Sequence, residues 1–193
     1  MRYLVGILVV IFLAILGIVL LVGGGGNNDS ASKPAKLSKT ADYENSDGAS
    51  ISWTHQGQLV GDDKYRSIRV TVTRSTRKIE ILSGYQDRVE RTNEYPNTAA
   101  AFSTFTRALD NQGFGKERTV KQPDDRGICP LGNRFIYRLT DNSQEIMRTW
   151  SDTCLTANGP FGGGTNAVAT IQQLFRAQIP DYYNYTANVQ LSY

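Results

Sequence analysis

The sequence has few of the residues that most often carry out catalysis. Among its 193 residues there is one histidine, His55, and there are two cysteines, Cys129 and Cys154. No G-x-S-x-G, H-E-x-x-H or kinase motif is present, which excludes the enzyme classes that these patterns identify. A zinc site needs several ligands, and one histidine without a C-x-x-C pair does not supply them. We therefore predict no catalytic residue, no metal site and no cofactor.

An enzyme whose site forms only in the fold remains the alternative interpretation. His55 lies in the strand-like run SISWTH, and a lone histidine on a strand is far more often a packed residue than a catalytic base. Adjacent acids occur in GDD at 61–63 and in PDDRG at 123–127, where they usually cap turns rather than bind calcium. The two carboxylates of a glycosidase are recognised by their separation in space, which a sequence does not give.

The N-terminal run from Tyr3 to Val22 contains no charged residue. As a helix it spans about 30 Å, the thickness of the hydrocarbon core of a bilayer. It is longer than the roughly 7–15 apolar residues of a secretory signal, and no A-x-A step follows it. We predict that residues 1–22 are an uncleaved transmembrane signal anchor. A pilin-type helix, the competing interpretation, needs a processed leader and an acidic residue that this run lacks.

The residues that flank this run predict its orientation and the domains that follow. Arg2 and the amino terminus stay on the cytoplasmic side, which places the rest of the chain outside. Residues 23–48 are rich in Gly, Asn, Ser, Lys and Asp and predict a flexible linker. Residues 49–193 are then one extracytoplasmic domain of ordinary size. Because the net charge of the whole chain is only +3, we predict no nucleic-acid partner.

Strand-like and helix-like patterns both occur in residues 49–193. The runs SISWTH, YRSIRVTVT, RKIEIL and YQDRVER predict an antiparallel meander with one dry face and one wet face. Phe102, Phe105 and Leu109 then follow helical spacing up to Gly113. A second helix is predicted in AVATIQQLFRAQ, and ANVQLSY is a candidate last strand. Without a regular βαβ alternation, these elements predict an α+β fold with two helices packed on the sheet.

A hairpin is predicted between the two helices. The runs NRFIYRLT and QEIMRTW flank Asp141-Asn142, a dipeptide that tolerates the left-handed turn of a two-residue loop. This register predicts three facing pairs: Ile136 with Met147, Arg138 with Glu145, and Cys129 with Cys154. It also predicts a core face that consists of Phe135, Tyr137, Leu139, Ile146 and Trp150.

The facing cysteines predict a disulfide that clamps this hairpin. Cys129 and Cys154 lie opposite each other in the predicted register, at a separation that a disulfide spans. Outside the cytoplasm, two cysteines in one small domain usually pair. A catalytic redox pair would normally be close in sequence. We predict a structural disulfide, with free thiols as the alternative.

Basic residues concentrate between positions 64 and 91. Eight Lys or Arg residues stand there against three Asp or Glu residues, an excess of +5. On the wet face of the meander they would form a basic patch suited to acidic envelope polymers or lipid head groups. The predicted anion-binding patch consists of Arg66, Arg69, Arg74, Arg77 and Lys78. The alternative is a solvated sheet face whose charges protect the edge of the sheet.

Two other segments are weaker candidates for binding. The loop GPFGGGT precedes the second predicted helix and could present amide groups to an anion. Its glycines are equally explained by the backbone freedom that a turn needs. Tyr182, Tyr183 and Tyr185 could form a sugar-stacking or partner-binding surface, or they could belong to the core and its rim.

Three longer segments resemble a known group of proteins. YRSIRVTVTRSTRKIEILSGYQ, RGICPLGNRFIYRL and LFRAQIPDY are similar to segments of small signal-anchored extracytoplasmic proteins from candidate-phyla, Saccharibacteria-like bacteria. The resemblance covers most of residues 60–183. It implies a bacterial envelope setting and a paired Cys129 and Cys154, and it carries no assigned activity.

These observations favour a non-catalytic binding module at the cell envelope. Its expected partners are the lipid bilayer, through residues 3–22, and acidic envelope polymers or another envelope protein. An envelope hydrolase is one alternative. The other is an accessory subunit of a membrane complex, for which the apolar helix has no packing signal, because Gly6 and Gly17 are not spaced as G-x-x-x-G.

Overall fold

The computed structural model describes residues 39–121, 123–154, 159–164 and 166–191. The chain divides into two compact units, Met1–Lys36 and Leu37–Tyr193, and all described residues belong to the second. The predicted signal anchor at residues 1–22 and the first part of the predicted linker therefore lie outside the described residues. Within the described part of the chain, no helix is long and apolar enough to cross a membrane.

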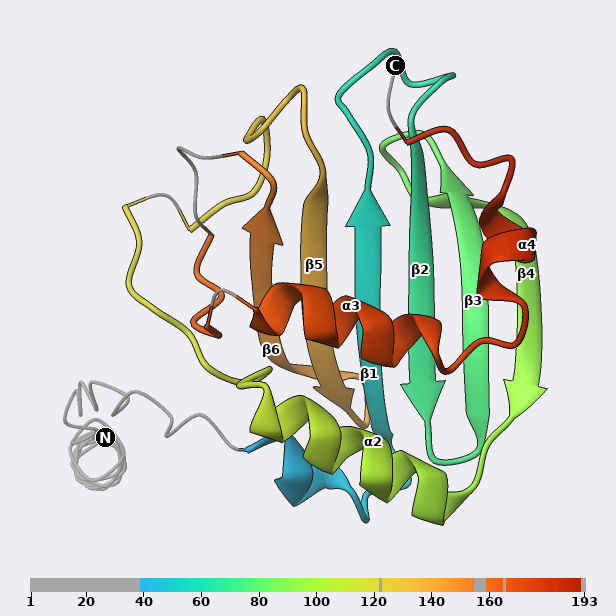
Figure 1. Cartoon of the computed structure of the whole chain (residues 1–193), viewed down its shortest axis with the longest axis vertical. Helices are drawn as coiled ribbons and strands as arrows, with labels where there is room; N and C mark the ends of the chain where they lie inside the picture. The colour runs from blue at the N-terminus through green and yellow to red at the C-terminus, as the bar shows by residue number, and fades with distance from the viewer. Residues whose placement is uncertain (1–38, 122, 155–158, 165, 192–193) are drawn as a thin grey trace, which may run out of the picture. The chain divides into compact units, whose positions relative to one another are not determined.

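The domain is built on a six-stranded antiparallel sheet with the strand order β4-β3-β2-β1-β5-β6 (Figure 1). The predicted meander comprises β1 (Ala49–Gln56), β2 (Arg66–Thr73), β3 (Thr76–Ser83) and β4 (Arg88–Pro96). The predicted hairpin comprises β5 (Arg134–Asp141) and β6 (Gln144–Asp152), and β5 pairs with the free side of β1. The expected α+β fold on an antiparallel sheet is confirmed.

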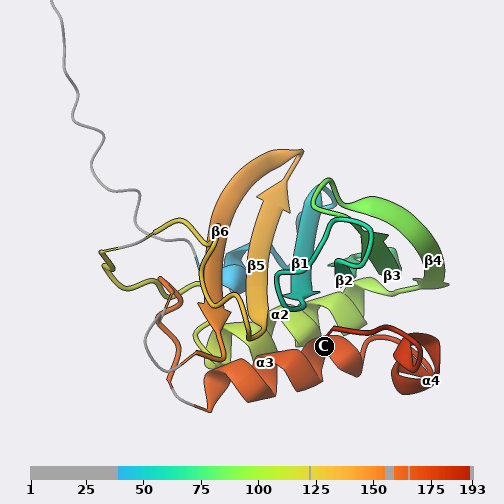
Figure 2. The same ribbon diagram turned by 90° about the horizontal axis from the view of Figure 1, so that it is seen from above.

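Both predicted helices lie on one face of this sheet (Figure 2). They are α2 (Ala99–Asn111) and α3 (Ala167–Arg176), and a short α4 (Tyr182–Thr186) follows. α2 begins at Thr98, whose hydroxyl accepts a hydrogen bond from the backbone N–H of Ala101 at 3.2 Å and so satisfies one free donor of the first turn. The opposite face of the sheet, which we call the open face, is covered by none of the described helices (Figure 2).

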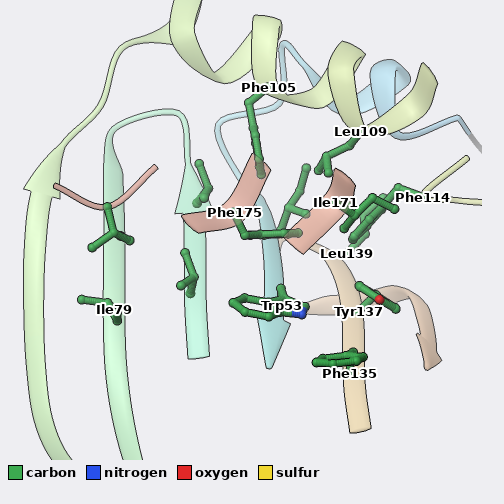
Figure 3. Close-up of a cluster of buried hydrophobic side chains, with 14 of the residues drawn as sticks. Trp53, Ile79, Phe105, Leu109, Phe114, Phe135, Tyr137, Leu139, Ile171 and Phe175 are labelled. Atoms are coloured by element: carbon green, nitrogen blue, oxygen red, sulfur yellow. The ribbon is translucent and has the colours of Figure 1, made fainter. Parts of the chain in front are cut away.

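The hydrophobic core lies between the sheet and the two helices (Figure 3). Trp53 of β1 is fully buried and lies beside Val70 of β2 and Tyr137 of β5 in the register of the sheet. Phe175 of α3 stacks on Trp53 with ring centroids 6.0 Å apart, and Phe105 of α2 meets Phe175 edge to face at 5.1 Å. Each such side chain stabilises the fold by about 1.5–3 kcal/mol through burial, so the sheet and both helices share one core.

The open face carries the alternate residues of each strand. On β1 these are Ser50, Ser52, Thr54 and Gln56. Towards the β6 edge, loop residues 123–128 pack over this face. There the indole N–H of Trp150 donates to the carbonyl oxygen of Pro123 at 2.7 Å. Trp150 and its partner in register, Ile136, are both buried under this loop.

The predicted register of the β5–β6 hairpin is wrong. The loop consists of Asn142 and Ser143, which both have positive φ (47° and 67°), and Asp141 pairs with Gln144. A register irregularity between Leu139 and Thr140 adds a further shift, as a β-bulge does. The resulting pairs are Ile136 with Trp150, Arg138 with Arg148, and Leu139 with Met147.

This shift changes the predicted core face in one important respect. Phe135, Tyr137 and Leu139 point into the core as predicted. Trp150 instead lies on the open face, because it pairs with Ile136 and the side chains of a strand alternate between faces. Ile146 is only partly buried against the core.

The predicted disulfide between Cys129 and Cys154 is present, with an S–S distance of 1.99 Å and a Cα–Cα distance of 5.6 Å. Neither cysteine lies in a strand: Cys129 precedes β5 and Cys154 follows β6. The bridge therefore joins the two loops at the open end of the hairpin. It does not depend on the strand register from which we predicted it.

The two ends of the domain differ from prediction. Ordered structure begins before residue 49, with a 3-10 helix, η1 (Thr40–Tyr43), followed by Glu44. The carboxylate of Glu44 accepts hydrogen bonds from Arg107 of α2 at 2.6 and 2.8 Å, so the linker was predicted to extend too far. At the other end, residues 187–191 form no strand.

Candidate functional site

The structure does not bring the predicted basic patch together. Alternation along β2 places Arg69 on the open face and Arg66 on the helix-covered side. Arg77 pairs in register with the core residue Val72 and so also belongs to the helix-covered side. Lys78 lies on the open face, across from Thr71. The predicted single surface is therefore divided between the two sides of the sheet.

Carboxylates also neutralise most of this patch. Arg66 pairs with Glu90 at 2.9 Å, Arg74 pairs with Asp47 at 2.8 Å, and Lys78 pairs with Glu80 at 3.0 Å. Arg69 pairs with Asp87 and also lies within 3.9 Å of Glu80. Two acids from outside that stretch, Asp47 and Asp62, pair with Arg74 and Arg88 and lower the excess of +5 counted along the sequence to +3. Anion binding by these five residues remains an untested prediction.

His55 is a packed residue on the helix-covered side of β1. Its ring lies 4.9 Å from that of Phe135, and Nε2 lies 3.2 Å from Oδ1 of Asn133. Burial lowers the pKa of His55 to about 4, and the hydrogen bond with Asn133 opposes this shift only in part. The imidazole is therefore neutral at physiological pH, and it does not share a hollow with a carboxylate pair.

The adjacent acids serve turns and arginines. Asp62 accepts a hydrogen bond from the backbone N–H of Tyr85 at 2.7 Å, which holds the β3–β4 turn. Asp124 pairs with Arg126, and Asp125 pairs with Arg148 at 2.5 Å. Among the described residues, one cluster has atoms suited to a metal, namely the two cysteine sulfurs and an oxygen of Asp152, all within 4.8 Å of one another. Both sulfurs are in the disulfide, so they are not thiolate ligands.

The glycine-rich loop and the tyrosines mainly serve packing. A Cβ at Gly159 would lie 2.2 Å from the carbonyl oxygen of Trp150, and one at Gly163 would lie 2.3 Å from the ring of Phe161. These two glycines permit close packing of the loop against Trp150 and Phe161. Tyr182 is buried beside Arg176, and only Tyr183 of the three tyrosines is strongly exposed, at 70%.

A pocket at one end of the open face has the features of a binding site. It lies where β1 ends and where β2 and β5 begin, and its volume is about 350 Å³. β1 and β5 supply neighbouring floor residues, since Gln56 pairs in register with Arg134. The remaining lining comes from Tyr65 before β2, the β3–β4 turn, and the loop that covers Trp150. The lining residues are Gln56, Leu59, Tyr65, Tyr85, Asp125, Arg126, Gly127 and Arg134.

Arg134 is the central residue of this pocket. It is only 3% exposed, yet it makes no ion pair with any carboxylate in the described part of the chain. Its guanidinium donates to the hydroxyl of Tyr65 at 3.2 Å and to the backbone carbonyl of Asp125 at 3.4 Å, while Nε has no partner. The Asp125 carboxylate is engaged by Arg148. A buried charge without a counter-charge is unfavourable, so an anion in this pocket would stabilise Arg134.

Two stacked tyrosines form one wall of the pocket. The rings of Tyr65 and Tyr85 lie 4.2 Å apart, and Tyr65 is 2% exposed whereas Tyr85 is 49% exposed. Tyr85 is fixed in place because its hydroxyl donates to the carbonyl oxygen of Val60 at 2.7 Å. Burial raises the pKa of Tyr65 to about 12, although the charge of Arg134 acts in the opposite direction. Tyr65 is therefore a neutral phenol, and Tyr85 presents a rigid aromatic surface at the mouth.

The sequence did not predict this site. Arg134 precedes the predicted core residue Phe135, and no function was predicted for it from the sequence. Nothing in the run RGICPLGNRF indicates that the preceding loop folds back over β5 and buries this arginine. The only usable signal was the position of Arg134 directly after a disulfide-linked loop, which ties that loop to the end of the strand.

A larger hollow, of about 520 Å³, lies at the C-terminal end of α2. Two acids, Asp110 and Glu117, line it together with Lys39 and Lys116. Partial burial raises the pKa of Glu117. This hollow places two acids together, and it is the structural basis for the enzyme alternative.

Comparisons with known proteins assign no family to this arrangement. No protein-family model matches the chain, and no curated protein matches it. The site is therefore characterised by its own geometry: one buried and unpaired arginine, one exposed aromatic wall, and a floor of polar strand residues.

Proposed function

We propose that this protein is a non-catalytic binding module held at the bacterial cell envelope, and that it binds acidic envelope polymers through the pocket at Arg134. One observation carries the proposal: a 350 Å³ pocket is lined by a buried arginine that has no carboxylate partner among the described residues. In this proposal residues 1–22 are a single-pass anchor with the N-terminus in the cytoplasm, and the domain lies outside.

The energetics of Arg134 support an anionic ligand. Transfer of a charged arginine side chain from water into the protein interior costs on the order of several kcal/mol of free energy, unless a counter-charge offsets this cost. The fold supplies only a phenol oxygen and a backbone carbonyl. A ligand carboxylate or phosphate would complete the set of partners with charge-assisted hydrogen bonds. Acidic polymers repeat such groups along one chain, which raises the local concentration of ligand.

The composition of the pocket argues against catalysis there. Acid–base chemistry needs a titratable group within reach of the reacting atoms. His55 does not line this pocket, and the one acid that does, Asp125, is already paired with Arg148. The second candidate function is an envelope hydrolase that uses the hollow of Asp110 and Glu117, because the raised pKa of Glu117 is a property of general acids.

Binding to cell-wall sacculi tests the proposed function. Full-length protein in a neutral detergent is sedimented with sacculi that carry their acidic polymers and with sacculi stripped of them. Arg134→Gln should lower binding at least about tenfold, because the ligand anion loses its charged partner. Arg77→Gln is the matched control, since it removes one positive charge from the other side of the sheet, and it should leave binding unchanged.

The contrary results are specific. Equal sedimentation with stripped sacculi, or equal losses for Arg134→Gln and Arg77→Gln, overturns the proposed function. Cleavage of envelope polymers by the wild type that Glu117→Gln abolishes would establish the hydrolase instead. If only the double variant Arg66→Glu and Arg69→Glu loses binding, the binding site is the basic patch predicted from the sequence and not the pocket at Arg134.

A further inference from the structure

We infer that the anionic group bound at Arg134 is the carboxylate of an acidic sugar, such as a hexuronate unit of an envelope polymer, rather than a phosphate monoester. This inference rests on the proposed function and specifies the ligand of the same pocket. It follows from three properties of the lining: the number of uncompensated charges, the geometry of the donors, and the aromatic wall.

The count of charges favours a singly charged ligand. The charged residues of the lining are Asp125, Arg126 and Arg134. Arg126 pairs with Asp124, and Asp125 pairs with Arg148. Arg134 is therefore the one lining charge without a partner in the described part of the chain. A single carboxylate balances it, whereas a phosphate monoester would bring a charge of about −1.5 to −2.

The geometry of the donors favours a planar group. A guanidinium is a planar fork with five N–H donors, and two parallel hydrogen bonds match it to a carboxylate. Described residues accept only two hydrogen bonds from Arg134. Phosphate sites commonly add the backbone amides of a helix N-terminus. Here the helices cover the other face of the sheet (Figure 2), so no helix N-terminus contributes to the pocket.

The rest of the lining favours a sugar as the carrier of the carboxylate. The half-exposed ring of Tyr85 stands at the mouth and is fixed by its hydrogen bond to Val60. Its free face offers an apolar platform for the C–H face of a pyranose. Gln56 lies on the floor of the pocket beside Arg134. Its side-chain amide can exchange hydrogen bonds with hydroxyl groups, which a hexuronate carries on the same rigid ring as its carboxylate.

A panel of four small probes tests this inference on the full-length protein in detergent. The probes are D-glucuronate, D-glucose, glucose 6-phosphate and N-acetyl-leucine, and binding is measured by calorimetry. Glucuronate should bind at least about tenfold more tightly than the other three, since each lacks either the carboxylate or the sugar ring. Arg134→Lys keeps the charge but removes the planar fork, and it should weaken glucuronate binding at least about tenfold.

A surface variant keeps the test decisive if the buried arginine variant does not fold. Tyr85→Ala alters an exposed side chain and should also weaken glucuronate binding. Tyr183→Ala removes a strongly exposed tyrosine of α4, which does not line the pocket, and it should have no effect.

Each contrary outcome has its own meaning. Tighter binding of glucose 6-phosphate overturns the carboxylate, and equal binding of N-acetyl-leucine overturns the sugar. Binding of no probe overturns the ligand assigned here, but if Arg134-dependent binding to sacculi persists, the proposed function stands. Equal effects of Tyr85→Ala and Tyr183→Ala also overturn the inference.

Discussion

Single side chains in this domain behave according to what folds against them rather than according to their neighbours in sequence. Arg134 and His55 are both polar residues on strands, yet burial makes one an unpaired cation and the other a neutral base. Arg69 and Lys78 were predicted to belong to a basic patch, and both lie within ion-pair distance of Glu80. The pocket is therefore defined by the one buried cation to which the described residues supply no counter-charge.

Acid should destabilise the folded domain partly through His55. Its pKa is about 4 in the folded state and about 6.5 when unperturbed. Between these values the unfolded chain binds a proton that the folded chain does not, so stability falls as the pH falls from about 6.5 to about 4. The contribution is at most about 3 kcal/mol.

The comparison of His55→Gln with the wild type measures this contribution. The wild type should lose more stability than the variant across that range in urea unfolding experiments. Parallel pH profiles for the two proteins would contradict a neutral, partly buried His55.

Among the elements, the β5–β6 hairpin is the one whose details matter most for the site. Its register places Arg134 beside Gln56 and places Trp150 under the loop that forms the pocket wall. Three local features fix this arrangement: the Asn142-Ser143 turn, the irregularity after Leu139, and the disulfide at the open end. The same hairpin in the predicted register would bring Trp150 into the core and leave the loop without its anchor.

Ser143→Gly should stabilise the domain. Ser143 has a φ of 67°, a conformation that costs a residue with a side chain about 1 kcal/mol or more, and glycine adopts it without that cost. Urea unfolding should therefore show a gain of roughly 0.5–1 kcal/mol. Ser75→Gly in the β2–β3 turn is the matched control, since Ser75 does not have a positive φ and glycine there only adds freedom to the unfolded chain. A gain from Ser75→Gly and none from Ser143→Gly would contradict the observed turn.

Removal of the disulfide should cost about 3 kcal/mol, the chain-entropy estimate for a loop of this length. The two cysteines are 25 residues apart in sequence. The double variant carries Cys129→Ala together with Cys154→Ala. Thermal unfolding of the oxidised wild type, the reduced wild type and the double variant measures the effect. The reduced wild type and the double variant should have the same melting temperature, and a reductant should not change the melting temperature of the double variant. Equal melting temperatures for all three would show that the bridge is dispensable.

At the scale of the whole molecule, the domain is close to electrically balanced and held by one core. In the described part of the chain, most basic residues of the meander meet a carboxylate, which weakens long-range attraction of anions to this surface. In the proposed function, recognition then depends on direct contacts of the ligand with the pocket at Arg134, and long-range electrostatic attraction contributes little. Binding through such a pocket should respond to salt less steeply than binding through a patch of five cations would.

The proposed orientation predicts the result of protease treatment of intact cells. Proteinase K added outside should degrade the domain while a cytoplasmic marker protein stays intact. The disulfide agrees with this expectation, because disulfides persist in oxidising compartments. Degradation only after the membrane is opened would reverse the orientation.

The sequence predicted the architecture well and the site poorly. Alternation in β1 and β2 and the helical spacing of Phe102, Phe105 and Leu109 indicated the correct elements, because each element buries a face with its own period. The hairpin register was wrong, since the positive φ of Ser143 and an irregular pairing are properties of the backbone that composition does not reveal. The pocket was missed for a different reason. It depends on a loop that folds over β5, and no local pattern specifies where a loop comes to rest.

The position of the pocket has a practical consequence for how this protein is handled. The chain enters the domain at η1, beside the start of β1, while the pocket lies where β1 ends (Figure 1). A strand of eight residues separates the two, a distance of about 26 Å. The described C-terminal segment lies at the pocket end, where the carbonyl oxygen of Leu191 accepts a hydrogen bond from the backbone N–H of Gln58 at 2.8 Å. Because η1 lies a full strand away from the pocket, surfaces and labels are better attached through the N-terminal side.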